Sequence, residues 1–375
     1  MKKVVHLTSA HSRYDDRILW RECRSLCERG YDVTLIVNDA QENETLDSGI
    51  KILSTGFVPR GRRQRMTTGV SKVYELGVAQ DADVYHLHDP ELLRIALRLK
   101  QKRKKVIFDS HEFYGEQIKS REYIPTIVRS FIAGSYHVYE TYVCKRLDGV
   151  IVPALYDGKE TFSGRAKRIA HVNNCPRRSE YGTTTIPAYA ERKGVCYSGG
   201  LSENRGITNL VEAGKKAGAK ILLAGRFSST AYEKQILDGA SSDEVEYIGY
   251  INSREDVFSF YAHCAIGVGL LIDDGQYGKM EGLPTKVYEY MAAEMPVLIS
   301  DFPYNRKIIE KHRFGLVANP TDVEDIAAKT TWLLEHPKEA EEMGKNGKRL
   351  LEEQFTWERA AEPELFSLYQ EVEQD

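Results

Sequence analysis

Residues 4–37 read VVHLTSAHSRYDDRILWRECRSLCERGYDVTLIV and contain one complete strand–helix–strand pattern. The apolar run 4–8 predicts a buried strand, and the amphipathic stretch 15–29 predicts a helix. Gly30 stands where a helix commonly ends, and 32–37 is the next apolar run. Strands that alternate with helices in this way indicate a parallel sheet covered by helices on both faces.

The same alternation continues through the rest of the chain with one interruption. Residues 175–194 contain prolines, threonines and charges without a regular period, so we interpret them as a linker. We therefore expect two doubly wound α/β domains, 1–174 and 195–355, which bind ligands at the carboxyl ends of their strands. Further strands are expected at 83–88, 105–111, 149–154, 194–199, 219–225, 245–250, 265–271, 296–300 and 314–318.

The composition is that of an ordinary soluble protein. The 375 residues are 42% hydrophobic and 29% charged, and the net charge of -3 argues against general nucleic-acid binding. Six cysteines without a CxxC pair favour a reducing compartment over a disulfide framework. The N-terminal apolar run is too short for a signal peptide, and no run approaches the roughly 18 apolar residues of a membrane-spanning helix. We expect a cytoplasmic protein, with peripheral attachment to the inner face of the cell membrane left open.

Charge is distributed unevenly along the chain, because residues 1–180 are net basic and the remainder is net acidic. Two clusters concentrate the basic residues, from Arg60 to Arg65 and from Arg98 to Lys105. They are either solvated surfaces or points of attraction to an anionic membrane or an anionic acceptor; near such a membrane each basic residue contributes about 1 kcal/mol.

Two common phosphate-binding loops are absent from the sequence. The loop after the first strand, TSAHSRYDDR, has no glycine, and the corresponding loop of the second domain, SGGLSENRG, does not fit GxGxxG. No GxxxxGK[ST] motif occurs either. Hydride transfer with a dinucleotide and P-loop phosphoryl transfer are therefore poorly supported.

A different phosphate site is suggested by residues 281–297, EGLPTKVYEYMAAEMPV. Pro284 suits the first turn of a helix, whose positive dipole end would present backbone N–H groups near Leu283 and Thr285 to an anion. Lys286 would add a positive charge in the first turn of the same helix.

Three further residues extend this hypothesis. Arg205 would begin another helix and, together with Lys286, suits a diphosphate, although both residues could equally be ordinary surface cations. The pair Glu281 and Glu289 allows three interpretations: a detail of the helix, a catalytic dyad, or one edge of a binding site. Glu289 is either an exposed helix glutamate or an acceptor of hydrogen bonds from a ribose diol.

The segment GLPTKVYEYMAAEMPV resembles the signature of family-4 retaining glycosyltransferases, in particular of the subgroup that builds bacterial surface and capsular polysaccharides. Segments 109–113, 172–176, 197–213 and 355–370 are similar to further segments of that family, in the same order. The resemblance covers most of the chain and implies the GT-B fold. Two Rossmann-like domains would then face each other across a cleft, and the last helix, 356–375, would join the first domain.

The resemblance also implies roles for individual residues. Glu281 and His111 would contact the donor sugar as catalytic residues, and Glu289 would bind the ribose. The position of an arginine common in the family is Gly199 here, so another residue must supply that phosphate contact. The donor-binding set is Arg205, Lys286 and Arg226 for the phosphates, Leu283, Pro284 and Thr285 for backbone contacts, Gly249 and Tyr250 for the base, and Glu289.

The acceptor is expected on the first domain. Its first loop, HSRYDDR, lacks the glycine pair common in the family, and HLHDPE (86–91) ends a strand. Zinc at HLHDPE would need a third ligand that the sequence does not place, so we assign this segment an acceptor-side or structural role. Asp273 and Asp274 are assigned to a turn rather than to a metal. No metal and no other cofactor is expected. The acceptor-side residues are His11, Asp15, Asp89 and Glu91.

The implied activity is that of a retaining, metal-independent glycosyltransferase of cell-surface polysaccharide biosynthesis, such as capsule or exopolysaccharide. It would move a sugar from a nucleotide-diphosphate sugar to a glycan or a lipid-linked glycan. A UDP-sugar is favoured, and the GDP and ADP forms stay open. Two alternatives remain: a nucleotide-sugar epimerase or hydrolase, and a non-catalytic partner subunit that binds sugar nucleotides, which Gly199 and the atypical first loop would support.

Overall fold

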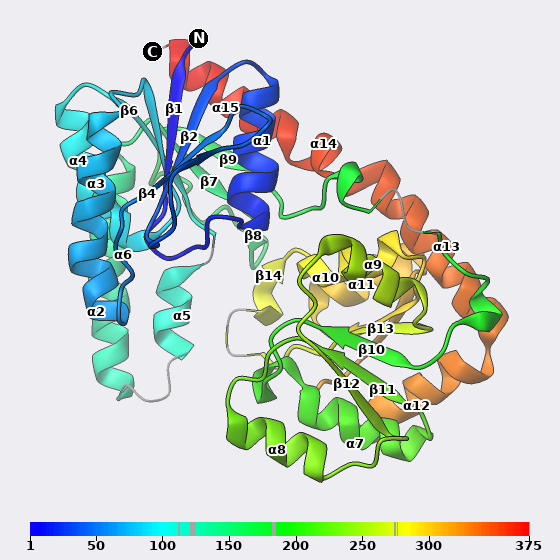
Figure 1. The fold of residues 1–375 in the computed structure, drawn as a ribbon. Helices are drawn as coiled ribbons and strands as arrows, with labels where there is room; N and C mark the ends of the chain where they lie inside the picture. The colour runs from blue at the N-terminus through cyan, green and yellow to red at the C-terminus, as the bar shows by residue number, and fades with distance from the viewer. Residues whose placement is uncertain (112, 121–124, 182–184, 274, 276, 375) are drawn as a thin grey trace. The chain divides into compact units, whose positions relative to one another are not determined.

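The computed structural model describes residues 1–111, 113–120, 125–181, 185–273, 275 and 277–374 (Figure 1). It divides into two compact units, Met1–Asn174 with Ala360–Asp375, and Cys175–Arg359. The stretch 175–194, which we expected to be a separate linker, lies within the second unit. The backbone N–H of Trp357 donates to the carbonyl oxygen of Pro176 at 2.8 Å, which holds the start of the C-terminal segment to the second unit.

The first unit contains an eight-stranded sheet in the order β3-β4-β2-β1-β5-β6-β7-β9. All neighbouring strands are parallel except the β3–β4 pair. The expected strands are present within one or two residues of their predicted bounds, whereas β3, β4 and β9 were not expected. The strands are β1 (Lys3–Leu7), β2 (Asp32–Val37), β3 (Glu44–Thr45), β4 (Lys51–Ser54), β5 (Val84–Leu87), β6 (Lys105–Asp109), β7 (Gly149–Val152) and β9 (Ile169–His171), with β8 (Leu155–Tyr156) outside this sheet.

Alternation along β1 separates the two faces of this sheet. Val5 and Leu7 belong to an apolar core with α3 (Val70–Ala79), α4 (Leu93–Gln101) and α6 (Thr126–Cys144), whereas His6 points to the opposite face. The helix expected at 15–29 covers that opposite face, but its first part is a wider π-helix, η1. The C-terminal helix α15 also packs there, since the Tyr369 hydroxyl lies 2.9 Å from His86 Nδ1. The helices are η1 (Asp16–Cys23), α1 (Arg24–Glu28), α2 (Arg62–Gln64), η2 (Arg65–Gly69), α3 (Val70–Ala79), η3 (Pro90–Leu92), α4 (Leu93–Gln101), α5 (Tyr114–Ser120), α6 (Thr126–Cys144) and α15 (Glu362–Gln374).

The second unit contains a six-stranded, fully parallel sheet in the order β12-β11-β10-β13-β15-β16. All six strands were expected. The strands are β10 (Val195–Ser198), β11 (Ile221–Ala224), β12 (Val245–Gly249), β13 (Ile266–Gly269), β15 (Val297–Ser300) and β16 (Gly315–Ala318), with the short β14 (Met280–Glu281). The helices are η4 (Arg178–Glu180), η5 (Tyr189–Glu191), η6 (Glu203–Arg205), α7 (Ile207–Ala217), α8 (Thr230–Asp238), α9 (Arg254–Ala262), η7 (Tyr277–Lys279), α10 (Thr285–Ala292), α11 (Pro303–His312), α12 (Val323–Glu335), α13 (Pro337–Gln354) and α14 (Trp357–Ala360).

Both sheets reverse their direction of winding at their first strand. In the first unit β2 and β4 lie on one side of β1, and β5, β6 and β7 lie on the other. In the second unit β11 and β12 lie on one side of β10, and β13, β15 and β16 lie on the other. The loops that leave the carboxyl ends of two such neighbours diverge, which opens a crevice for a ligand. The fold therefore points to the β1–β5 edge and the β10–β13 edge.

Candidate functional site

The loops after β1, β5 and β6 line a cavity of about 320 Å³ in the first unit. Four predicted residues meet there: His11 after β1, Asp89 and Glu91 after β5, and His111 after β6. Asp15 has a different position. Its carboxylate caps η1 and accepts hydrogen bonds from the backbone N–H groups that begin the helix, at 3.0 and 2.9 Å.

His11 and Asp89 form a charged pair at the mouth of this cavity. His11 Nδ1 lies 3.1 Å from Asp89 Oδ1. Burial alone would lower the pKa of His11, but the hydrogen bond to Asp89 and its charge raise it to about 9. Burial would raise the pKa of Asp89, yet the same contact and the Ser9 backbone N–H at 2.6 Å hold it below its usual value. At neutral pH the cavity thus presents an imidazolium and a carboxylate.

His111 is held in a different state by its surroundings. Its Nε2 lies 3.1 Å from His88 Nδ1. Burial lowers the pKa of His111 to about 3, although the Asp109 carboxylate opposes the shift. Arg17 donates from Nε and Nη2 to the two oxygens of Asp109 at 3.0 and 3.1 Å and so neutralises this carboxylate. His111 is therefore a neutral ring at neutral pH, able to exchange a hydrogen bond with a sugar hydroxyl.

The first basic cluster contributes to the cavity wall. Arg65 Nε lies 2.7 Å from Glu91 Oε1, and Arg62 donates to the hydroxyl of Tyr114. Both arginines line the cavity. From the sequence, the cluster from Arg60 to Arg65 was either a solvated surface or a point of attraction to an anionic membrane or acceptor. The structure places two of its members where a polar ligand would meet them.

The second basic cluster is partly neutralised within the first unit. Lys100 Nζ lies 2.6 Å from an oxygen of Asp148, and Lys104 Nζ lies 2.7 Å from an oxygen of Asp81. Arg98 lies over the ring of Tyr74, at 5.9 Å from its centroid. At least two of the positive charges in the cluster from Arg98 to Lys105 are therefore neutralised by carboxylates of the same unit.

In the second unit Lys286 lies against the end of β10. Its Nζ donates to the hydroxyl of Tyr197 at 3.0 Å and lies 4.2 Å from the centroid of that ring. A Cβ added to Gly199 would come within 2.9 Å of the same Nζ. Lys286 thus fills the space beside Gly199, the position where the resembled family has an arginine. Among the described residues, Lys286 is the cation nearest to Gly199.

The helix that carries Lys286 begins as the sequence predicted. Pro284 is the residue before α10, with the buried Leu283 preceding it, and Thr285 is the first helical residue. Glu294, which replaces a glycine of the resembled motif, has a φ of 52° just beyond the helix end. This departure falls at a helix end, away from the N-terminus that would hold a phosphate.

Arg205 lies at the β10–β13 edge. It ends η6, and its guanidinium carbon lies 5.7 Å from the centroid of Tyr277. The following Gly206 has a φ of 72°, and a Cβ there would lie 2.2 Å from the carbonyl oxygen of Leu270. Only glycine fits this close approach, which fixes the loop of Arg205 against the loop after β13.

Glu289 is buried rather than exposed, and both of its oxygens have partners. Oε1 accepts from Arg254 Nη1 at 2.9 Å, and Oε2 accepts from the Tyr261 hydroxyl at 3.0 Å. Each carboxylate oxygen can accept a second hydrogen bond, so a ribose would share these oxygens or displace a partner. Arg254 and Tyr261 were missed by the sequence analysis, because nothing in their local pattern marks them out within α9.

The remaining predicted donor residues gather at the ends of β11 and β12. Arg226 lies over the ring of Tyr250, at 4.1 Å from its centroid. Gly249 has a φ of 83°, and its carbonyl oxygen accepts from the backbone N–H of Gly225 at 2.7 Å. Arg226 is therefore engaged with the predicted base-binding residue. Glu281 lies in β14 and is partly exposed.

Asp273 forms a turn, as expected. Its Oδ1 accepts from the backbone N–H groups of Gly275 and Gly278 at 2.9 and 3.0 Å. Asp274, the other half of this acidic pair, lies outside the described residues.

Two family models match the chain in succession. Residues 16–175 match "Glycosyltransferase Family 4", and residues 185–350 match "Glycosyl transferases group 1". No curated protein matches the chain in sequence.

Solved structures resemble the whole chain. A sucrose-phosphate synthase from Thermosynechococcus elongatus has a TM-score of 0.76 at 16% identity, covering 100% of this chain and 99% of its own. A glycosyltransferase from Rickettsia africae has a TM-score of 0.71 at 13% identity, with the same coverage. HepE of Anabaena, solved with UDP and glucose, has a TM-score of 0.67 at 14% identity, again with the same coverage. These likenesses confirm the expected GT-B fold.

Proposed function

Because the chain belongs to the glycosyltransferases that combine a family 4 domain with a group 1 domain, we propose that it transfers a sugar from a nucleotide-diphosphate sugar, with retention of configuration. The observation that carries this proposal is the position of Lys286. It stands in the first turn of α10, at the end of β10 where the sheet order reverses. A cation at a helix N-terminus suits a diphosphate.

The proposed donor is a UDP-sugar. HepE was solved with UDP and with UDP-glucose, and TarM of S. aureus was solved with UDP. In our chain Lys286 and Arg205 would neutralise the diphosphate, and Glu289 would bind the ribose. Gly249 and Tyr250 would lie near the base, with Arg226 behind Tyr250. Glu281 and His111 would contact the sugar.

The proposed chemistry follows the movement of charge. The bond between the sugar C1 and the diphosphate oxygen breaks while the acceptor hydroxyl oxygen bonds to C1 on the same face. The leaving diphosphate gains negative charge, which Lys286, Arg205 and the first N–H groups of α10 stabilise where it appears. A diphosphate oxygen takes the proton of the acceptor hydroxyl. These fixed cations serve in place of a metal, and under this mechanism Glu281 and Glu289 do not act as an acid–base pair.

The proposed acceptor site is the cavity of the first unit. Its charged His11–Asp89 pair, the neutral His111 and the arginines Arg62 and Arg65 are suited to sugar hydroxyls and to a phosphate. We therefore propose a glycan or a lipid-linked glycan as acceptor, in the synthesis of a cell-surface polysaccharide such as a capsule.

Helix α6 supports the choice of a lipid-linked acceptor. Among the described residues no helix is long and apolar enough to cross a bilayer. Yet α6 exposes large apolar side chains, with Ile127 85% and Phe131 75% exposed. Together with the basic cluster Arg60–Arg65 of the same unit, exposed apolar side chains of this kind favour a protein that rests on an anionic membrane. Binding to anionic vesicles should weaken with added salt and in the Phe131→Ser variant, and unchanged binding of that variant would refute the role of α6.

Donor turnover tests the proposed function. The purified chain is incubated with UDP-, GDP- and ADP-sugars, with and without lipid-linked glycan extracts, and nucleoside diphosphate release is measured. We expect release that depends on acceptor, and a product whose anomeric configuration matches the donor by NMR. Conversion of the donor without acceptor would instead identify an epimerase or hydrolase. Tight donor binding without turnover across the acceptor panel would identify a non-catalytic subunit.

A further inference from the structure

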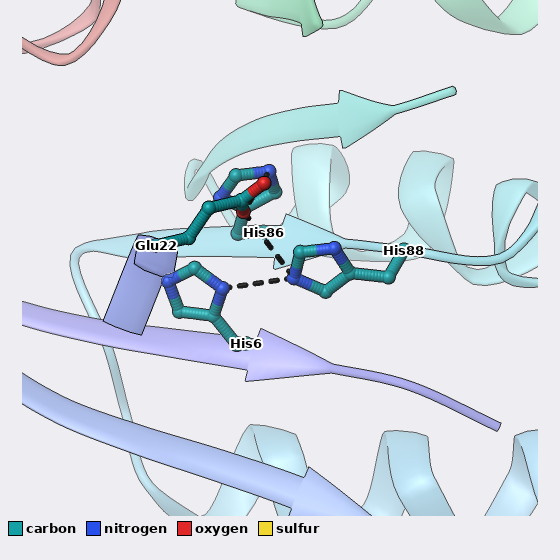
Figure 2. Close-up of side chains that lie close together, drawn as sticks. All are labelled: His6, Glu22, His86 and His88. Atoms are coloured by element: carbon teal, nitrogen blue, oxygen red, sulfur yellow. Dashed lines mark hydrogen bonds and ion pairs between the residues drawn. The ribbon is translucent and has the colours of Figure 1, made fainter. Parts of the chain in front are cut away.

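Three histidines and one glutamate meet inside the first unit, on the sheet face covered by η1 (Figure 2). His6 comes from β1, His86 and His88 from β5 and its end, and Glu22 from η1. His6 is paired in register with His86, so both point to the same face, and His88 follows at the alternate position. All four side chains are fully buried, at 0–1% exposure.

The ligand-bearing atoms of this cluster converge. A ring nitrogen or carboxylate oxygen from each residue lies within 4.8 Å of those of the other three. His6 Nδ1 and His88 Nε2 are 2.8 Å apart. Oε2 of Glu22 lies 3.7 Å from His86 Nε2 and 4.0 Å from His88 Nε2. His6 and Glu22 thus stand where the further ligand that the sequence did not place beside HLHDPE would be needed.

Several of these atoms lack hydrogen-bond partners among the described residues. They are His6 Nε2, His86 Nε2 and both oxygens of Glu22. An unpaired buried polar group costs about 1–3 kcal/mol, and an unpaired charge costs more. Four such atoms in one place indicate that the cluster takes up a further group.

Arg17 lies beside Glu22 but is shared with a second carboxyl group. Arg17 Nε lies 3.0 Å from Glu22 Oε1, without the alignment of a hydrogen bond. The hydrogen-bonding groups of Arg17 are directed instead to Asp109, at 3.0 and 3.1 Å, and to the carbonyl oxygen of Val172, at 2.9 Å. One guanidinium thus faces two buried carboxyl groups, Glu22 and Asp109, and its hydrogen bonds go to Asp109.

We propose that His6, His86, His88 and Glu22 bind a divalent transition-metal ion of the zinc class. Three imidazole nitrogens and one carboxylate oxygen are a ligand set that zinc accepts in tetrahedral geometry. The ion would supply a partner for the converging atoms. Ligands about 2.0–2.1 Å from a tetrahedral zinc lie roughly 3.3 Å from each other, so the rings of His6 and His88 separate slightly on binding.

Outer hydrogen bonds already orient two of the rings. His86 Nδ1 lies 2.9 Å from the Tyr369 hydroxyl, and His88 Nδ1 lies 3.1 Å from His111 Nε2. Such contacts to the distal nitrogen fix the ring of a metal-bound histidine. The ion would therefore fasten η1 to the centre of the sheet, and through His88 it would position His111 at the cavity. This role is structural and does not depend on the proposed glycosyl transfer.

Metal content tests the proposal directly. The tag-free chain is expressed in defined medium with either Zn²⁺ or Co²⁺, because a fully buried ion is expected to enter during folding. Elemental analysis should find about one ion per chain, and the Co²⁺ form should show the visible absorption bands of a tetrahedral nitrogen–oxygen site. The Zn²⁺-grown protein should unfold at a higher temperature than protein grown in chelated medium.

Variants localise the ion. His86→Ala and Glu22→Gln should each lose most of the bound metal. His171→Gln, a histidine change on β9 of the same sheet outside the cluster, should keep it. Should a variant fail to fold, the Co²⁺ spectrum of the wild-type chain still reports the ligand set. A metal-free wild-type chain from Zn²⁺ medium with an unchanged unfolding temperature would overturn the proposal, as would full metal retention in both cluster variants.

Discussion

Replacing Lys286 by glutamine tests the proposed phosphate site. The change keeps a polar side chain, shorter by one atom, and removes the charge that lies beside Gly199. Two unit charges about 4 Å apart attract by roughly 4 kcal/mol at an effective dielectric constant of 20, which suits this half-buried position. A hydrogen-bond donor directed at the charge that develops in the transition state lowers the activation free energy by about 2.7–4 kcal/mol. We therefore expect kcat/KM for the donor to fall about 10²- to 10³-fold.

The assay is nucleoside diphosphate release at saturating acceptor over a donor series. Lys307→Gln, at an exposed position on α11 of the same unit, is the matched control and should stay within about twofold of wild type. Thermal unfolding of both variants checks that the loss of the hydrogen bond to Tyr197 leaves the fold intact. A folded Lys286→Gln variant that keeps roughly half of the wild-type kcat/KM or more would refute the role of this charge.

Three further predictions concern the wider structure. Gly206→Ala should destabilise the chain by about 2–4 kcal/mol in urea unfolding, since its φ is 72° and a Cβ would lie 2.2 Å from a carbonyl oxygen. The control Gly218→Ala, with a φ of 60° and open space around the Cβ, should destabilise it by only about 1 kcal/mol. Equal losses of stability in the two variants would contradict the steric argument. The hydrogen bond to Glu160 raises the pKa of His171, so this pair stabilises fully below the unfolded pKa of about 6.5 and loses its effect as pH rises through the folded pKa. His171→Gln should thus lower the unfolding midpoint at about pH 5.5 more than at about pH 9, and an equal loss at both would exclude the ion pair as its cause. Glu289→Gln should weaken nucleoside diphosphate binding about 10-fold in calorimetry, and unchanged affinity would remove Glu289 from the donor site.

The strands and the cavity residues were predictable because their signals are local. Apolar runs of four to six residues mark the central strands, whereas β3, with two residues, is too short to show a pattern. His11 and Asp89 each follow a predicted strand, His111 ends one, and parallel strands end at a common edge. Their convergence on one cavity therefore follows from their places in the sequence alone.

The partners of the buried charges were not predictable, because each pair joins distant parts of the chain. Arg17 and Asp109 are 92 residues apart, and Arg254 and Glu289 are 35 apart. Nothing near Glu22 indicates that a π-helix will direct its carboxylate toward histidines of another strand. Such pairings depend on packing in three dimensions, which a single sequence does not encode locally.

The C-terminal helix α15 determines which of the two units can finish folding first during synthesis. It belongs to the first unit, where Tyr369 reaches His86, Glu362 accepts from Ser25 at 2.6 Å, and Glu373 pairs with Lys2 at 2.8 Å. The second unit, by contrast, is one uninterrupted stretch of chain. Domains generally fold as units during synthesis. The first unit, whose sheet is translated before the second unit, is therefore completed only after α15 has emerged.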